Sequence, residues 1–310
     1  MLSHSPGIVR THTFRGVSFK YYDIANCAHY IIDEVVVRDR WWHVNSGDVI
    51  LDIGAGFGSY ALPACALGAT VYAFSPEADM GDVFVMNVDV NGFNDRCQIY
   101  TFGLYDRQGY NAPMSQRFST EPIHDEVSFL VLPLDQFMEN HREISRVDWV
   151  KVDVEGAELE VLRGGVNTIR KFTPRILVEN HLFKRPNVGL EVKQLIESWS
   201  LGYTSSTFPY HGVSHSFYTT PDNQLIGIPP RMTLVDAQIH GSEDCDRETL
   251  QRVLRQGAER MDVGKSLGFF VPKKEWSEYE VARLTLECGF YQTLTQEEGD
   301  WIGVVTIRAG

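Results

Sequence analysis

The residues best suited to chemistry in this chain are two carboxylates and a histidine that follow apolar stretches. Asp153 and Glu155 are two positions apart after the stretch 147–152, and His181 ends the next one. A carboxylate or imidazole within reach can take the proton of a hydroxyl group, and repulsion between neighbouring carboxylates raises the pKa of one toward that of a useful base. Alternatively, the two carboxylates could hold a divalent metal with Asn180 or His181, which is the less favoured hypothesis.

Each of these residues also has a structural interpretation. Negative charge at Glu155 or Glu158 stabilises the start of a following helix, and for Glu158 this is the preferred explanation. Lys151, inside the strand, could pair with a neighbouring carboxylate. A hydrogen bond from His181 could simply end its strand, so its chemical and structural roles both stay open.

A second chemical feature is the glycine-rich stretch Val49–Tyr60. An apolar run leads into Asp52 and then into three glycines at alternate positions, Gly54, Gly56 and Gly58. Glycines between a buried strand and a helix let the backbone turn tightly and approach a ligand, while free N–H groups of the helix start point at it. Ser59 stands where the dinucleotide fingerprint needs its third glycine, which disfavours a nicotinamide cofactor.

The residues named above must be positioned by one fold. The pattern of apolar and polar residues along the rest of the chain predicts which fold this is. Apolar runs typical of buried parallel strands alternate with helical segments, which indicates a doubly wound α/β sheet. Because ligands bind beyond the carboxyl ends of such strands, we expect the glycine turn, Ser75–Glu77, Asp153, Glu155 and 179–181 to meet in one crevice. Residues 107–127 are expected to form a loop, and the aromatic and histidine-rich stretch 208–218 either an acceptor pocket or a packed loop.

The motifs carry a resemblance to a known family. The D-x-G-x-G-x-G turn resembles the first motif of class I S-adenosylmethionine (AdoMet) methyltransferases. Lys151–Leu162 and Pro174–His181 are similar to the "KIDVEGAE" and "P…I.VE.H" patterns of the FkbM methyltransferases, and Asn87–Gly92 to their "N…LNG". The resemblance covers roughly 47–230 and implies a Rossmann-like fold, AdoMet as cofactor and O-methylation of a sugar or secondary metabolite.

The resemblance also implies residue roles. The three glycines would seat AdoMet, Asp52 would orient its amino-acid end, and Asp153, Glu155 and His181 would face the methyl group and the acceptor. The family has "AFEP" after the second strand, with Glu as the ribose ligand, whereas this chain has Ser75 there and Glu77 two residues later. Either Ser75 or Glu77 would therefore meet the ribose, or affinity for the cofactor has been lost. A sensor or scaffold protein that binds AdoMet without turnover is the alternative to a methyltransferase.

Composition sets the remaining limits. The chain of 310 residues is 43% hydrophobic and carries a formal net charge of −13, which disfavours nucleic acid as a partner. No apolar run is long enough to span a membrane, no signal peptide is recognisable, and five separated cysteines suit free thiols, so we expect a cytoplasmic protein with a small hydroxylated substrate.

Three regions are predicted along the chain. Residues 1–46 form an N-terminal flank or lid, residues 47–230 the methyltransferase domain, and residues 231–310, after Pro229-Pro230, a small β-α-β-α-β-β sandwich. The order of the last region resembles SirA/TusA-like sulfur carriers, but Cys245 lacks their following proline. A homo-oligomer or protein contact through this region is its expected role.

Overall fold

The computed structural model describes residues 8–24, 31, 37–38, 41–112, 117–124, 127–210, 213–223, 250–252, 254–255, 266–272, 277–288, 290–298 and 301–308. The chain divides into two compact units. The first contains Met1–Phe208 and Ser214–Gln224, and the second contains Pro209–Val213 and Leu225–Gly310. The boundary predicted at residue 230 lies outside the described residues.

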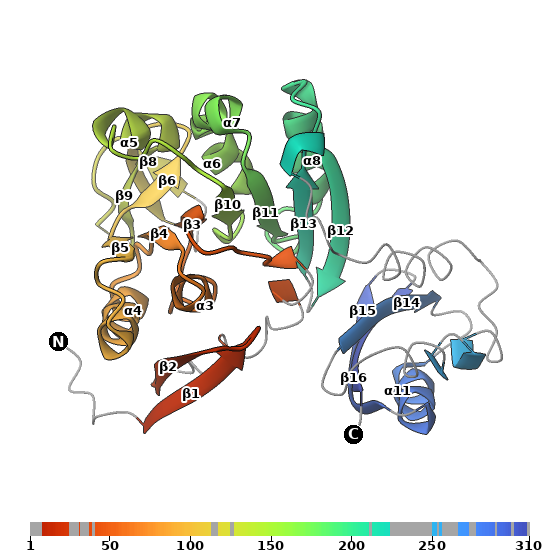
Figure 1. The fold of residues 1–310 in the computed structure, drawn as a ribbon. Helices are drawn as coiled ribbons and strands as arrows, with labels where there is room; N and C mark the ends of the chain where they lie inside the picture. The colour runs from red at the N-terminus through yellow and green to blue at the C-terminus, as the bar shows by residue number, and fades with distance from the viewer. Residues whose placement is uncertain are drawn as a thin grey trace. The chain divides into compact units, whose positions relative to one another are not determined.

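A seven-stranded sheet forms the framework of the first unit (Figure 1). Its strands are, in chain order, β3 Val49–Ile53, β4 Thr70–Phe74, β5 Cys97–Tyr100, β10 Trp149–Val152, β11 Arg175–Asn180, β12 Thr204–Tyr210 and β13 Val213–Thr219. In space the order is β12-β13-β11-β10-β3-β4-β5, with β11, β10, β3, β4 and β5 parallel and β13 antiparallel to β11. This arrangement confirms the predicted Rossmann-like, doubly wound sheet.

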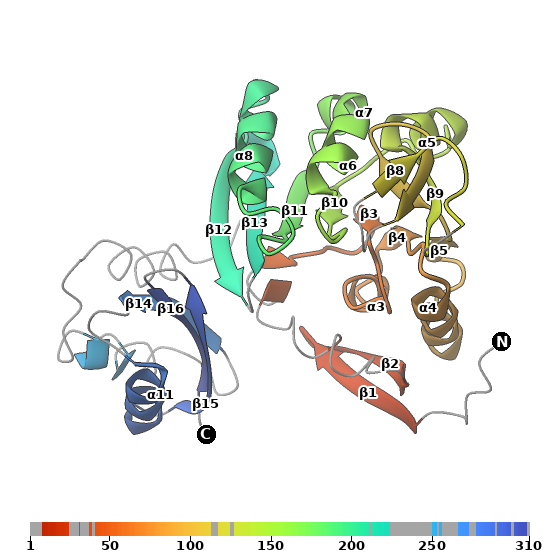
Figure 2. The same cartoon turned by 180° about the vertical axis from the view of Figure 1, so that it is seen from behind.

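Helices cover both faces of this sheet, which explains the apolar character of its central strands. Their bounds are α3 Ala61–Ala66, α4 Ala78–Asn91, α5 Leu134–Asn140, α6 Glu158–Gly164, α7 Val166–Phe172 and α8 Val188–Ser198. Helices α3 and α4 lie on one side and α5 to α8 on the other (Figures 1 and 2). Helix α4 ends where the sequence predicts, at Gly92 in the left-handed conformation with φ 68°.

An antiparallel hairpin precedes the sheet. It pairs β1 Ile8–Phe14 with β2 Val17–Asp23, so the strand expected near Val17 has a partner that the sequence did not reveal. The hairpin packs against α3 and α4. Asn87 of α4 makes the connection, because its side chain accepts a hydrogen bond from Tyr22 N (2.8 Å) and donates one to Phe57 O (3.1 Å).

The predicted loop at 107–127 is wrong, because this segment contributes to a four-stranded sheet. The strands are β6 Gly103–Tyr105, β7 Gly109–Ala112, β8 Arg117–Ser119 and β9 Phe129–Pro133, in the order β6-β9-β7-β8. The segment 99–104, expected to form a third strand and its exit loop, contains the end of β5 and the start of β6. Strands this short show no alternation of apolar and polar residues, and their pairing is set by partners distant in sequence.

The helix expected after β10, with Gly164-Gly165 near its end, is α6, and a second helix, α7, begins after Gly165. The described residues of the stretch 208–218 lie in strands rather than in a loop. The stretch contains parts of β12 and β13, and all seven residues of β13 are buried.

The second unit contains a three-stranded antiparallel sheet in the order β14-β16-β15. The elements are β14 Ser266–Pro272, α11 Glu278–Glu287, β15 Phe290–Glu298 and β16 Trp301–Arg308, which matches the helix and hairpin expected there. The strand expected at 233–235 and most of the helix expected at 247–260 lie outside the described residues. None of the described helices has the length and apolar character that crossing a bilayer requires.

Asn87→Ala should lower the free energy of unfolding by about 1–3 kcal/mol, because it leaves a buried N–H and a buried carbonyl without their partner. Urea denaturation measures this loss. Val85→Ala in the same helix is the control, since Val85 is 44% exposed, and it should cost less than about 0.5 kcal/mol. Equal losses in the two variants would contradict the bridging role of Asn87.

Candidate functional site

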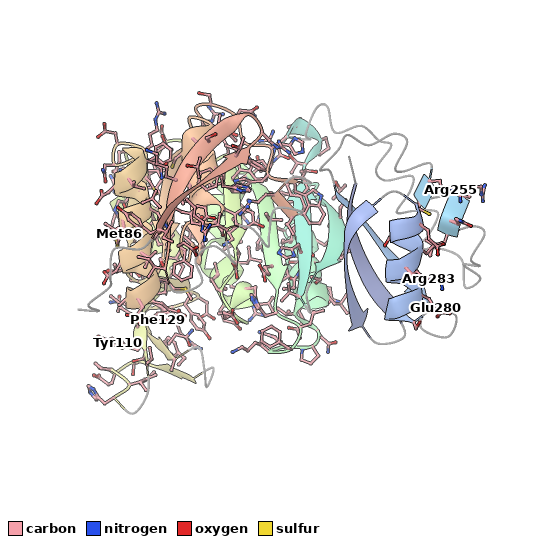
Figure 3. The ribbon with its side chains drawn as sticks, turned by 90° about the horizontal axis from the view of Figure 1, so that it is seen from below. Met86, Tyr110, Phe129, Arg255, Glu280 and Arg283 are labelled. Carbon is pink, nitrogen blue, oxygen red and sulfur yellow. The ribbon has the colours of Figure 1, made fainter. Side chains whose placement is uncertain are left out.

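A cavity opens at the carboxyl ends of β3, β4 and β10, where the strand order reverses between β3 and β10. Such a reversal is the usual ligand site of an open α/β sheet. The space amounts to about 960 Å³ including its open mouth and adjoining solvent. Its walls are Ile53–Phe57, Ser59, Phe74–Glu77, Met80, Gly103, Leu104, Asn111, Phe129, Asp153–Glu155 and Ala157. Figure 3 labels Phe129.

The glycine turn forms one wall of the cavity. At Gly54, which has φ 81°, a Cβ atom would lie 1.6 Å from the carbonyl oxygen of Asp153, so only glycine fits. The N–H groups of Gly54 and Ala55 both donate to Phe74 O, which ties the turn to β4. Gly56 has φ 53° and space beside it, since the nearest atom to a Cβ would be Met80 Sδ at 3.9 Å. The turn therefore lets a ligand approach the backbone at Gly56.

Lys151 joins the turn to the acidic end of β10. Its Nζ donates to Gly54 O (2.8 Å) and to Asp153 Oδ2 (3.0 Å), and lies 3.4 Å from Asp52 Oδ1. The side chain of Asp52 is fully buried, and burial raises its pKa although Lys151 opposes the shift. Asp52 lies outside the cavity lining, so the side chain expected to orient a cofactor meets the turn through Lys151.

Ser75 and Glu77, the two candidates for a ribose contact, both line the cavity. Ser75 is buried, and its Oγ donates to Gly56 O (3.2 Å). Glu77 occupies the N-cap position of α4 without a side-chain capping hydrogen bond, and it is exposed. The carboxyl group of Glu77 is nevertheless partly buried, which raises its pKa, and the nearby charges of Glu155 and Asp79 raise the pKa further.

The three predicted chemical residues come together. His181 Nε2 lies 3.7 Å from Asp153 Oδ1 and 3.6 Å from Glu155 Oε1, whereas the imidazole itself is buried. Glu155 has φ 55°, an uncommon conformation for a non-glycine residue, and its side chain is 53% exposed. Asn180 is directed elsewhere, because its amide donates to Ser214 O (2.8 Å) and Ser216 Oγ (3.0 Å) in β13.

Glu158 supports His181, a contact that the sequence did not predict. Its Oε1 lies 2.7 Å from His181 Nδ1 and also accepts a hydrogen bond from Gly156 N. Burial alone would lower the pKa of His181, but the hydrogen bond to Glu158 and the charges of Asp153, Glu158 and Glu179 outweigh it and raise the pKa to about 9. The imidazole therefore carries a proton at neutral pH.

Glu179 was expected at the crevice but was not predicted to contact His181. Its Oε1 lies 3.6 Å from His181 Nε2, and its Oε2 lies 3.1 Å from Nε2 of His215. Burial would raise the pKa of Glu179, but His215, His181 and Lys151 together lower it to about 2. The spacing of Glu179 and His181 along one strand places both side chains on the same face, which is the signal that could have identified Glu179.

A polar pocket adjoins the cavity. Its lining consists of Tyr105, Asn111, Val154–Ala157, Glu160 and Arg185. Asn111, Val154, Glu155 and Ala157 belong to both spaces. The guanidinium of Arg185 lies 3.1 Å from Glu160 and 2.7 Å from Glu191, so a cation stands at the edge of this pocket.

The parallel sheet, the glycine turn after its first strand and the cavity at the strand reversal define a Rossmann-like protein with a cofactor cavity. Residues 52–205 match the family model described as Methyltransferase FkbM domain, so this part of the chain is an FkbM methyltransferase domain. The predicted resemblance is thereby confirmed for its central part. The similarity of the last region to sulfur carriers stays a prediction.

Individual proteins are also similar to this chain. Over 159 residues the chain is 29% identical to the hexuronic acid methyltransferase AglP of Haloferax volcanii, covering 48% of this chain and 62% of that protein. The structure of methyltransferase FkbM from Methylobacillus flagellatus KT is 16% identical with a TM-score of 0.46, covering 61% of this chain and 48% of that one. TYW2 of P. horikoshii in complex with MeSAdo is 16% identical with a TM-score of 0.36, covering 69% and 71%. The chain thus spans about three fifths of the curated relative's length.

Gly54→Ala should lower the free energy of unfolding by more than about 3 kcal/mol, because strain of the left-handed conformation adds to the collision with Asp153 O. Gly92→Ala is a matched control, since Gly92 also has positive φ but nothing within 4 Å of a Cβ, and should cost only about 1–2 kcal/mol. Urea denaturation compares the two. Similar losses would show that the Asp153 contact is unimportant.

Lys151→Met should cost about 3–5 kcal/mol of unfolding free energy, because Asp52 and Asp153 then lose their buried cation. Adding Asp52→Asn should restore part of this loss, since it removes the deepest unpaired charge. Thermal and urea unfolding of the two single variants and the double variant measure this coupling. Lys193→Met, whose side chain is 50% exposed, is the surface control, and additive effects of Lys151→Met and Asp52→Asn would contradict the ion pair.

Proposed function

We propose that the protein is an AdoMet-dependent methyltransferase that methylates a hydroxyl group of a small sugar-like molecule, as the family and its sugar-modifying relative suggest. The observation that carries the proposal is that Glu155 borders both the cofactor cavity and the adjoining polar pocket. A hydroxyl held in the pocket would thus have a carboxylate beside it at the point where the two spaces meet.

The residues of the cavity fit AdoMet. The open backbone at Gly56 would hold the amino-acid portion of AdoMet, and Ser75 or Glu77 would form a hydrogen bond with its ribose. Apolar side chains at Leu104 and Phe129 offer surface for the adenine ring. Asp52 acts on the amino-acid end through Lys151 and the Gly54 carbonyl. When bound, AdoMet supplies an electrophilic methyl carbon, whose transfer forms an oxygen–carbon bond, breaks the sulfur–carbon bond and leaves S-adenosylhomocysteine.

Glu155 is the proposed proton acceptor among the three chemical residues. The proton that His181 already carries at neutral pH makes it an orienting partner for the carboxylates. Asp153 shares its Oδ2 with Lys151, whereas the side chain of Glu155 is half exposed at the junction. The hydroxyl proton therefore passes to Glu155 as the oxygen attacks.

A sugar acid suits the pocket chemically. Asn111 and Glu160 offer hydrogen-bonding groups for hydroxyls, and Arg185 offers a cation for a carboxylate. The sensor hypothesis makes a different prediction, since a sensor would bind AdoMet without methylating any hydroxylated compound. Departure from the family's acid at Ser75 keeps that hypothesis open.

The first test is calorimetry with AdoMet, S-adenosylhomocysteine and NAD⁺, followed by transfer of labelled methyl to a panel of hexuronic acids and their glycosides. We expect the first two ligands to bind and NAD⁺ to be rejected. Glu155→Gln should lower kcat about 10²- to 10⁴-fold while the AdoMet Kd changes less than threefold, because only the proton acceptor is lost. Glu139→Gln, an exposed site on α5, is the control. Failure of AdoMet to bind would overturn the proposal.

A further inference from the structure

The acidic residues beside the cofactor cavity surround a common centre. One oxygen each of Asp153 and Glu179 and one ring nitrogen of His181 all lie within 4.8 Å of one another. His181 Nε2 is 3.7 Å from Asp153 Oδ1 and 3.6 Å from Glu179 Oε1. These are side chains from the ends of two neighbouring strands, β10 and β11, directed at the same point.

The distances are those of ligands around a cation rather than of hydrogen bonds. Two ligand atoms that are each about 2.1–2.2 Å from a metal ion and 90–120° apart are about 3.0–3.8 Å from each other. A hydrogen bond between them would be shorter, about 2.7–3.2 Å. Three carboxylate oxygens lie 3.6–3.7 Å from His181 Nε2, which is longer than a hydrogen bond, and His181 as a residue is 2% exposed.

Every one of the three side chains is anchored through the atom that does not face the centre. Asp153 turns Oδ1 inward while Lys151 holds its Oδ2 at 3.0 Å. Glu179 turns Oε1 inward while His215 holds its Oε2 at 3.1 Å. His181 turns Nε2 inward while Glu158 holds its Nδ1 at 2.7 Å. An outer carboxylate on the far nitrogen of a histidine is the arrangement that orients imidazole ligands toward metal ions.

Charge favours the same occupant. The side chains of Asp153, Glu155, Glu158 and Glu179 bring four carboxylates around His181, and Glu158 has no exposed surface. Glu158 Oε2 has no hydrogen-bond partner among the described residues. A cation at the centre would be attracted by these carboxylates.

We propose that Asp153, Glu179 and His181 bind a divalent metal ion, with the carboxylate of Glu155 beside it. The mixed oxygen and nitrogen set suits Mn²⁺, Fe²⁺, Co²⁺ or Zn²⁺ better than Ca²⁺, which prefers oxygen alone. The alternative metal set that includes Asn180 is replaced, because its amide is bound to β13. The role of the ion rests on the proposed function. It would hold the acceptor hydroxyl beside Glu155 and lower the pKa of that hydroxyl.

The test is titration of the full chain with Mn²⁺ alone after treatment with EDTA, followed by electron paramagnetic resonance. We expect one bound Mn²⁺ per chain. Glu179→Gln and His181→Gln should weaken binding at least 10-fold, and Glu158→Gln, which keeps every ligand, should weaken it about 10- to 100-fold by releasing the imidazole. Glu139→Gln should bind as the unaltered chain does.

Two measurements keep the outcome decisive. Pulsed electron paramagnetic resonance of the unaltered chain should detect a nitrogen nucleus bound to Mn²⁺. This measurement does not depend on whether any variant folds. Near-ultraviolet circular dichroism checks that each variant is native. No stoichiometric binding, binding without nitrogen, or unchanged affinity in folded Glu179→Gln would each overturn the metal site. AdoMet binding is measured separately, so a chain that binds Mn²⁺ but not AdoMet contradicts only the proposed function.

Discussion

The buried ammonium group of Lys151 is the interaction on which the site depends. An ammonium group removed from water is stable only where carboxylates and hydrogen-bond acceptors surround it. Here its partners are the carboxylate of Asp52 on β3, the carbonyl of Gly54 in the turn and the carboxylate of Asp153 after β10. The glycine turn and the acidic cluster are thereby parts of one structure, and a displacement of either would disturb the other.

The outer strands extend this support. Glu179 of β11 is directly opposite His215 of β13, and the antiparallel pairing fixes that register. Ser214 and Ser216, on either side of His215, hold the amide of Asn180. Polar residues in a buried strand require such partners, because an unpaired polar group in the interior is costly. The antiparallel strand therefore does more than complete the sheet, since it fixes the direction of the Glu179 carboxylate.

The part of the fold that sequence predicts is the part with local signals. Residues close together in sequence determine the apolar runs of β3, β4, β10 and β11 and the end of α4 at Asn91-Gly92. These runs place Asp153, Glu155 and His181 at the edge of the sheet where the parallel strands end. The pairing of Glu158 with His181 and of Glu179 with His215 depends on register and helix orientation. The small sheet that supplies Asn111 and Phe129 depends on pairings such as β6 with β9, which no local pattern encodes.

The substitution of serine for the family's acid at position 75 has a physical explanation. Ser75 is nearly inaccessible to solvent, and its hydroxyl donates to the carbonyl of Gly56, so it stabilises the turn from within. A carboxylate could not donate this hydrogen bond and would repel the carbonyl. Glu77, exposed at the cavity wall and free of any side-chain capping bond, keeps its carboxylate available. The chain thus retains an acid near the end of β4 but holds it two residues later, so ribose recognition is expected to pass from Ser75 to Glu77.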